Sequence, residues 1–162
     1  MSKLQNFKSN LFLSLYAWTK IPLIGFCSPR VIEAGDQRTV LKVPLNYRTK
    51  NHLGAMYFGA LAIGAELSIA MLAVKKIQES GQRIDFLFKD FKAEFLKRAE
   101  GDVLFICDQA QTVVEQINEA KNSTERINRT MTAYAIVPSV SETEKVATFE
   151  LTLSVKNRAK KA

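Results

Sequence analysis

Hydrophobic and polar positions alternate in different ways along this chain, and each way predicts a different element. Residues 55–74 are apolar on every side and contain one charge, Glu66, so they predict a helix that lipid or the protein itself must surround. Residues 84–97, 125–137 and 146–156 alternate apolar and polar side chains, which is the period of a strand with one buried face. We therefore expect strands wrapped around one central helix.

Three further strands complete the predicted sheet. Val31–Ala34 and Thr39–Leu45 are separated by Gly35-Asp36, a pair typical of hairpin turns, and Val103–Gln109 follows the turn formed by Glu100-Gly101-Asp102. Together with the longer strands they predict an α+β domain with an antiparallel sheet of about six strands. Residues 113–121 fit either a short helix or a loop.

One predicted strand changes phase. In residues 84–97, Phe86 and Phe88 stand at even-numbered positions whereas Phe91 and Phe95 stand at odd-numbered ones, so a regular strand would point them to opposite faces. A single extra residue in the strand would return all four side chains to one face. The sequence therefore predicts a β-bulge near Lys89-Asp90.

The N-terminal region predicts an amphipathic helix over residues 4–18. Its apolar side chains recur at helical spacing: Leu4, Phe7, Leu11, Leu15 and Trp18. The apolar stretch is short and no small-residue cleavage site follows, which argues against a secretory signal. We expect this face to pack on the domain's own sheet, with an interfacial membrane helix as the alternative. Pro22 and Pro29 bracket a connector.

Length and composition predict one domain over residues 1–162. We divide it into an N-terminal helix and connector (1–29), a core (30–156) and a basic, solvated tail (157–162). Cys27 and Cys107 are too few for a disulfide framework, which favours a reducing, cytoplasmic compartment. With His52 as the only histidine, no multi-histidine metal site is expected, and neither a metal nor a redox cofactor is implied.

The net charge of +7 favours anionic partners, either phosphate-bearing small molecules or nucleic acid. No Gly-rich or aromatic-basic sheet signature is present, so we expect no nucleic-acid partner. The apolar helix is long enough to span a bilayer. Because the predicted strands can cover it, we expect a buried helix and no stable membrane insertion.

The central helix carries the candidate chemistry. Gly59 and Glu66 are seven residues apart and share a face, and the free amides of the first turn can stabilise a carbonyl oxygen that becomes an oxyanion. Glu66 lies roughly 10 Å along the axis from those amides, so one helix cannot easily bring both to one carbonyl. Two antiparallel copies can, which predicts a composite site in a homodimer or tetramer. A purely structural partner for Glu66 in the core is the alternative.

The same stretch resembles a known family. The pattern Asn51, Gly54, Tyr57-Phe58-Gly59 and Glu66, with the order of elements, is similar to hotdog-fold thioesterases of the PaaI-like type. In that family His-Gly-Gly opens the central helix and an acid follows seven residues after the second Gly. Here Tyr57-Phe58 stand in place of His-Gly, a variant that resembles a bacterial branch of the superfamily. The similarity covers about residues 30–155 and implies the hotdog fold, in which a sheet wraps around the helix.

The resemblance also implies roles for individual residues. Glu66 would be the general base or nucleophile, the Gly59 amide would donate to the oxyanion, and Asn51 would orient the carbonyl or the attacking water. Tyr57 can still donate a hydrogen bond, although a phenol is ordinarily a poor base at neutrality. The remaining candidates would contact substrate: His52, Gly54, Phe58, Lys97 and Arg98.

The function expected from this resemblance is hydrolysis of an acyl thioester of coenzyme A or of an acyl carrier protein. A non-catalytic hotdog protein that binds acyl-CoA is the alternative, and the Tyr57 departure favours it. For several of these residues a purely structural role is the alternative to a role in the site. His52 could serve at the surface or as a cap, Tyr57 and Phe58 could pack at the helix start, and Lys97 and Arg98 could be solvated charges.

Overall fold

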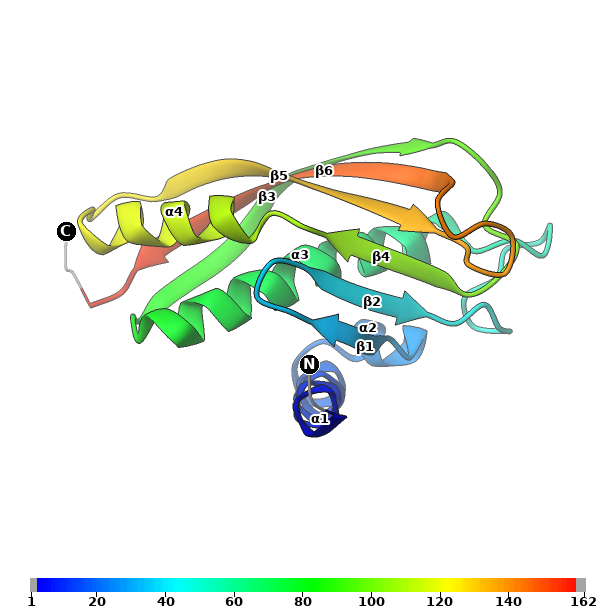
Figure 1. Cartoon of the computed structure of the whole chain (residues 1–162), viewed down its shortest axis with the longest axis horizontal. Helices are drawn as coiled ribbons and strands as arrows, with labels where there is room; N and C mark the ends of the chain where they lie inside the picture. The colour runs from blue at the N-terminus through cyan, green and yellow to red at the C-terminus, as the bar shows by residue number, and fades with distance from the viewer. Residues whose placement is uncertain (1–2, 160–162) are drawn as a thin grey trace.

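The computed structural model describes residues 3–159, with side chains from Phe7 onward. Its helices and strands, in chain order, are α1 (Lys3–Lys20), α2 (Pro22–Cys27), β1 (Arg30–Ala34), β2 (Thr39–Val43), α3 (Phe58–Ser80), β3 (Ile84–Phe95), β4 (Val103–Cys107), α4 (Ala110–Lys121), β5 (Ile127–Ile136) and β6 (Lys145–Asn157). The strands form one antiparallel sheet in the order β1-β2-β4-β5-β6-β3. The predicted α+β architecture is confirmed: the sheet curves over α3 (Figure 1).

Helix α3 is the centre of the core. It packs mainly against β2, β4 and β5 of the sheet and against α4, and its buried face includes Ala65, Ile69 and Leu72, none of which is exposed to solvent. It ends at Ser80, because the following Gly81 adopts a left-handed conformation with φ of 63°. Within the described residues, α3 alone is long and apolar enough to cross a membrane, and half of its apolar window is buried in the fold.

Close approach of α3 to the sheet depends on Gly64. A Cβ atom at this position would lie 2.3 Å from Cε2 of Phe105, whose ring is fully buried on β4. Phe105 in turn contacts the ring of Phe149 on β6, with 6.1 Å between centroids. The missing side chain therefore lets the helix rest directly on this ring pair.

The predicted β-bulge is confirmed. The register between β3 and β6 shifts between Phe88 and Phe91, and the side chain of Asp90 accepts a hydrogen bond of 2.9 Å from the Thr152 amide. Because the bulge removes a backbone partner from β6, the Asp90 carboxylate replaces it. Phe86, Phe88, Phe91 and Phe95 consequently pair with β6 residues of one parity and share the inner face of the sheet.

The ambiguous residues 113–121 belong to a helix, α4, which runs beside the C-terminal half of α3 (Figure 1). The fully buried Gln116 holds it to the sheet. Its Nε2 donates to the carbonyls of Ile127 on β5 and Leu153 on β6, at 2.9 and 2.7 Å. A polar residue at a core-facing position explains why hydrophobic periodicity alone left this segment open.

The two edges of the sheet differ. At the β1 edge, the side-chain amide of Asn10 in α1 donates to the Val31 carbonyl at 2.9 Å and accepts from the Val31 amide at 2.8 Å, as a neighbouring strand would. At the other edge, the outer side of the twelve-residue β3 has no neighbouring strand within residues 3–159. The sheet is therefore closed at β1 and open at β3.

The prediction that the apolar face of the N-terminal helix packs on the sheet is wrong. Helix α1 lies outside β1 (Figure 1) and buries Leu13 and Ala17, whereas Phe7, Leu11, Leu15 and Trp18 are exposed. The helix is apolar on two sides, and the bonds of Asn10 to β1 select the other one. The side chain of Leu4 lies outside the described residues.

Two boundaries also need correction. The connector between Pro22 and Pro29 contains a short helix, α2, whose Ile24 and Cys27 are buried. At the C-terminus, β6 continues through the buried Asn157, and Arg158 pairs with Asp85, so the sheet extends into the predicted tail. Residues 160–162 of that tail lie outside the described part.

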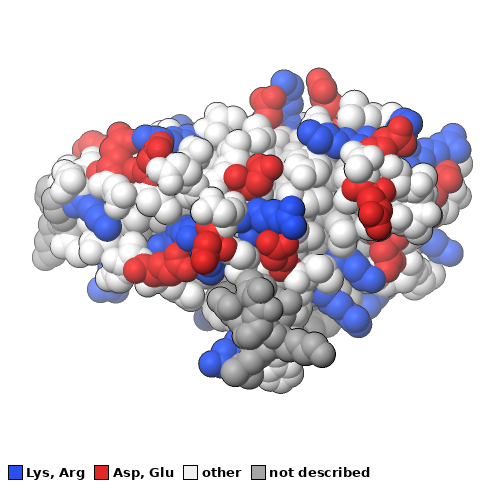
Figure 2. All heavy atoms as spheres, viewed as in Figure 1, with Lys and Arg blue, Asp and Glu red and all other residues white. Residues whose placement is uncertain are grey.

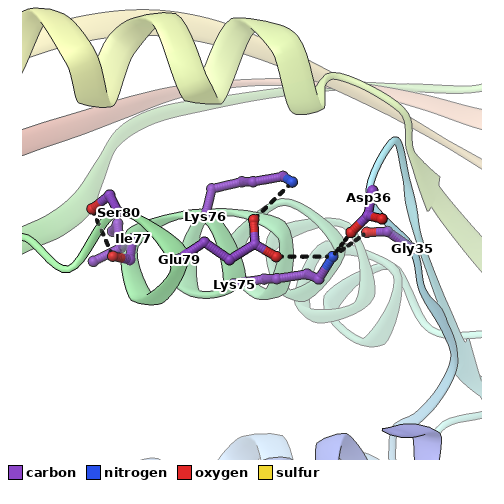
Figure 3. A network of polar contacts seen from close by, with 7 residues as sticks. All are labelled: Gly35, Asp36, Lys75, Lys76, Ile77, Glu79 and Ser80. Atoms are coloured by element: carbon purple, nitrogen blue, oxygen red, sulfur yellow. Dashed lines mark hydrogen bonds and ion pairs between the residues drawn. The ribbon is translucent and has the colours of Figure 1, made fainter.

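A polar cluster fixes the β1–β2 turn to the far end of α3 (Figure 3). The ammonium group of Lys75 donates to the Gly35 carbonyl at 3.1 Å and pairs with Asp36 of the turn and with Glu79 of the helix. Lys76 pairs with the same Glu79 carboxylate, at 2.9 Å. Lys75 thus binds the hairpin to the helix, and Lys76 pairs with Glu79 within the helix.

Candidate functional site

A hydrogen-bonded loop positions the start of α3. Thr49 is fully buried, and its hydroxyl donates to the Pro44 carbonyl at 2.6 Å and accepts from the Asn46 amide at 3.0 Å. The amide of Tyr57 donates to the Thr49 carbonyl at 2.7 Å, and the amide of Met56 to the Ala99 carbonyl at 2.8 Å. These bonds fix the loop at both ends before the helix begins.

Asn51 shapes the tip of this loop. Its side-chain oxygen accepts a hydrogen bond of 2.9 Å from the Leu53 amide, and its backbone amide donates to the Ala55 carbonyl at 2.7 Å. Gly54 has a φ of 82°, a left-handed conformation that favours glycine. The structure therefore gives Gly54 a role in the turn and leaves the side-chain NH₂ of Asn51 available to a ligand.

Beside the loop lies an open cavity of about 530 Å³. Six of the residues singled out from the sequence line it: Asn51, His52, Tyr57, Phe58, Lys97 and Arg98. Gly54, Gly59 and Glu66 are not among its lining residues. Besides Phe58, its apolar lining comes from residues that the sequence did not single out, including Met56, Leu61, Phe95 and Leu96. Phe95 and Leu96 stand at the end of a strand with clear alternation, and that end position is the signal that could have found them.

The first turn of α3 adjoins this cavity. The amides of Ala60 and Leu61 both donate to the Tyr57 carbonyl, at 2.9 and 3.1 Å. The amides of Phe58 and Gly59 have no hydrogen-bond partner among residues 3–159, and Tyr57 provides no side-chain cap. Two free N–H groups at the positive end of a helix dipole can stabilise an oxyanion.

The Tyr57 ring rests against Gly59. A Cβ atom at Gly59 would lie 2.5 Å from Cε1 of Tyr57, so a larger residue would displace this ring. The Phe58 ring lies beside it, with centroids 4.8 Å apart, and is exposed in the cavity wall. Tyr57 and Phe58 thus form an aromatic wall with one hydroxyl group.

Glu66 lies two turns further along α3 and is partly buried. Its carboxylate has no hydrogen bond or ion pair with any residue that the structure describes, and burial raises its pKa above the usual value. It shares a partly exposed stripe of α3 with Gly59, Ala62, Ile63 and Ala70. Within one chain, this carboxylate and the free amides therefore do not meet, as the helical spacing predicts.

The basic residues at the cavity differ in how available they are to a ligand. Lys97 forms an ion pair with Glu144 of the β5–β6 loop. Arg98 is exposed and has no ion-pair partner among the described residues, and His52 is exposed as well. Arg98 is consequently the cation most available to an anionic ligand here.

The cavity lies at the open edge of the sheet. Phe95, the last residue of β3, lines it, and the inner-face rings of Phe91 and Phe95 are 44% and 50% exposed. Since α3 packs mainly under β2, β4 and β5, it leaves this aromatic face of β3 uncovered. A second molecule at the β3 edge would therefore border the cavity.

No group of three or more His, Cys, Asp or Glu side chains that could hold a metal ion occurs in residues 3–159. Both cysteines are buried and unpaired, and burial raises the pKa of the Cys107 thiol to about 11. Such a thiol is protonated at neutral pH and is a poor nucleophile. Glu66 remains the strongest candidate for a catalytic group.

Solved structures share this fold. A protein of unknown function from Chlorobaculum tepidum aligns with a TM-score of 0.82 at 12% identity, covering 94% of this chain and 97% of its own. A Shewanella oneidensis protein with a provisional thioesterase assignment gives 0.78 at 12% identity, covering 93% and 99%. Zebrafish thioesterase superfamily member 2 gives 0.65 at 12% identity, covering 92% and 96%. The chain therefore has the same fold as these structures, the hotdog fold.

A comparison with curated protein sequences gives no significant match. Residues 9–155 match the family described as a domain of unknown function (DUF4442), and the chain belongs to that family.

Proposed function

We propose that this protein hydrolyses acyl thioesters of coenzyme A or of an acyl carrier protein in the cytoplasm, at a site shared between two copies of the chain. One observation carries the proposal. The free amides of Phe58 and Gly59 adjoin a cavity, whereas the unpartnered carboxylate of Glu66 lies two helical turns away on an incompletely covered face. A second copy would supply the missing half of each site.

The sheet edges support this assembly. Asn10 occupies the β1 edge, so the open side of β3 is the edge available for pairing. An unpaired strand of this length with exposed aromatic rings invites another strand. Pairing of two β3 strands about a two-fold axis would cover Phe91 and Phe95 and bring the α3 helices together.

The proposed reaction is general-base hydrolysis. The thioester carbonyl accepts hydrogen bonds from the Phe58 and Gly59 amides, while Glu66 of the other copy takes a proton from water. The water oxygen bonds to the carbonyl carbon, and the amides stabilise the negative charge on the tetrahedral oxygen. Collapse breaks the carbon–sulfur bond, and the proton held by Glu66 passes to the leaving thiolate. Asn51 and the Tyr57 hydroxyl would orient the carbonyl or the water.

A thiol-release screen across acyl-CoA chain lengths tests the activity, with Glu66→Gln as the decisive variant. Loss of the ionisable group should lower turnover by about two orders of magnitude or more while acyl-CoA affinity is kept. Glu142→Gln, in the exposed β5–β6 loop, is the matched control and should leave turnover unchanged. Equal turnover in Glu66→Gln and wild type would move the base elsewhere, with His52 the next candidate.

Complementation tests the shared site. Glu66→Gln and Gly59→Val should each be inactive alone, because one loses the base and the other displaces Tyr57 from the helix start. Mixed and re-annealed, they form heterodimers in which one site has both defects and the other has neither. About a quarter of wild-type activity should then return, since half of the dimers are mixed and each has one intact site. A fully active monomer in light scattering would contradict the shared site.

A non-catalytic acyl-CoA-binding protein is the second candidate, and Tyr57 favours it. A phenol at the position of the family histidine is a poor base at neutrality, and its ring leans on Gly59 instead of projecting freely. Tight binding of acyl-CoA without thiol release, for every chain length tested, would establish this function. On the face shown in Figure 2, acidic and basic groups are interspersed, a pattern that does not favour a nucleic-acid partner there.

A further inference from the structure

Helix α1 exposes a continuous apolar stripe that the hotdog core does not use. Phe7, Leu11, Leu15 and Trp18 recur every three or four residues on one side of the helix and are 65%, 51%, 59% and 57% exposed. We refer to these four residues as the α1 stripe. The fold holds the helix mainly by its other side, through Leu13, Ala17 and Asn10.

Helix α2 extends this apolar surface. The Trp18 ring lies directly over Gly25, where a Cβ atom would approach it to 2.8 Å, so the two helices join at this point. Leu23 and Phe26 of α2 are also largely exposed. Several large apolar side chains grouped on one short segment indicate an interaction surface, whereas scattered exposed leucines do not.

The charged residues of the segment that forms this surface have one sign. Residues 1–32 contain no aspartate or glutamate. Lys8 lies one turn from Leu11 on α1, Arg30 lines the same groove as Trp18, and the Arg48 guanidinium lies over the Phe26 ring at 5.5 Å. If two copies of the chain paired through this surface, their lysines and arginines would repel one another, because residues 1–32 provide no acidic side chains to pair with them. Anionic lipid headgroups complement both its charge and its apolar side chains.

We propose that α1 and α2 form a docking face for an anionic membrane surface. The α1 stripe lies in the boundary between headgroups and acyl chains, and Lys8, Arg30 and Arg48 meet lipid phosphates. Binding is interfacial and reversible, because α1 lies along the surface and α3 stays within the sheet. The hotdog domain is thereby held beside the membrane without crossing it.

Trp18 is the only tryptophan in the chain and reports directly on this contact. The full-length protein is mixed with vesicles of phosphatidylcholine alone or of phosphatidylcholine with phosphatidylglycerol. Co-sedimentation and a blue shift of Trp18 emission are expected with the anionic vesicles and should weaken as salt is raised. Each cation at the surface should contribute about fivefold to the partition coefficient.

The decisive variant is Leu11→Asp/Leu15→Asp. Both side chains are exposed, so the fold should persist, as circular dichroism can confirm, while the partition coefficient falls at least about tenfold. The matched control is Val140→Asp, which places a charge at an equally exposed apolar residue of the β5–β6 loop and should leave binding unchanged.

Two outcomes would overturn the proposal. The first is absence of both co-sedimentation and blue shift with anionic vesicles at low salt. The second is a smaller particle mass of Leu11→Asp/Leu15→Asp in light scattering with vesicle binding equal to wild type, which would show that another copy of the chain covers the α1 stripe.

Discussion

Replacing Gly64 by alanine tests how closely the central helix approaches the sheet. The added Cβ atom would lie 2.3, 2.4 and 2.6 Å from three atoms of the Phe105 ring, whereas carbon atoms in ordinary contact are about 3.5–4.0 Å apart. The ring cannot turn away easily, because Phe105 is fully buried on β4, between β2 and β5, and contacts Phe149. Helix and sheet must separate by about 1 Å, or the ring must leave its rotamer.

Two opposing contributions determine how much Gly64→Ala changes the free energy of unfolding. Alanine in a helix interior is favoured over glycine by about 1 kcal/mol. Forcing an extra carbon into a close-packed core costs about 1–3 kcal/mol, and three short distances to one immobile ring place this case at the upper end. We expect a net loss of about 1–2 kcal/mol in the free energy of unfolding, which lowers Tm by about 3–6 °C for a chain of this size.

Urea denaturation followed by circular dichroism measures this loss, and a double-mutant cycle assigns it. Phe105→Leu alone should destabilise the protein by leaving a cavity, but it also removes the ring atoms that Gly64→Ala would meet. The double variant should therefore be more stable than the sum of the single effects predicts. A Gly64→Ala protein more stable than wild type, with additive effects in the cycle, would refute the close approach.

Three further predictions concern charged groups. Because burial raises the pKa of Glu66, wild-type stability should fall as pH rises from the unfolded pKa of this carboxyl through its higher folded pKa. Glu66→Gln should be more stable than wild type above that range and equal to it below, as denaturation at several pH values will show. Asp102 should behave oppositely, because its hydrogen bonds from Lys42 and from the Leu45 amide lower its pKa. The stability that Asp102 contributes above its unfolded pKa should be lost as pH falls through its folded pKa. In the same denaturation measurements, Asp102→Asn should therefore lose less stability at acid pH than wild type does. Lys75→Met should cost about 1 kcal/mol through loss of its bond to the Gly35 carbonyl, and hydrogen exchange should locate the loosening in the β1–β2 turn.

Much of the fold could be predicted because its signals are local. Gly81 marks the end of α3 through its backbone conformation, and the change of alternation after Phe88 marks the bulge in β3. Each signal involves residues within a few positions of one another. The sequence therefore predicts the order of elements and the position of the bulge without knowledge of tertiary contacts.

The candidate site was predicted only in part for a related reason. Helical spacing correctly separates Glu66 from the free amides, since it depends on one helix. The cavity, by contrast, joins the loop before α3 to the end of β3, about forty residues later, through bonds such as that from the Met56 amide to the Ala99 carbonyl. The apolar lining by Phe95 and Leu96 depends on that long-range pairing, which no local pattern encodes.

The orientation of α1 also depends on a long-range contact that no local pattern encodes. Periodicity establishes that an apolar stripe exists but not what covers it. The choice of face depends on the two hydrogen bonds between Asn10 and Val31, which are twenty-one residues apart. A polar side chain thus determines which hydrophobic side of the helix is buried. A prediction based on hydrophobicity alone chooses the other side.

Those two hydrogen bonds also connect the fold to the proposed function. A six-stranded sheet with two open edges could pair with other copies at either end and extend without limit. Asn10 satisfies the backbone groups of Val31 in β1 and α1 packs against that strand, which leaves β3 as the open edge; pairing of like edges about a two-fold closes after two copies. The open edge is also the one beside the cavity and the free amides of α3. An N-terminal helix that closes one edge while exposing its own apolar stripe therefore restricts assembly to the edge where the proposed site needs its second half.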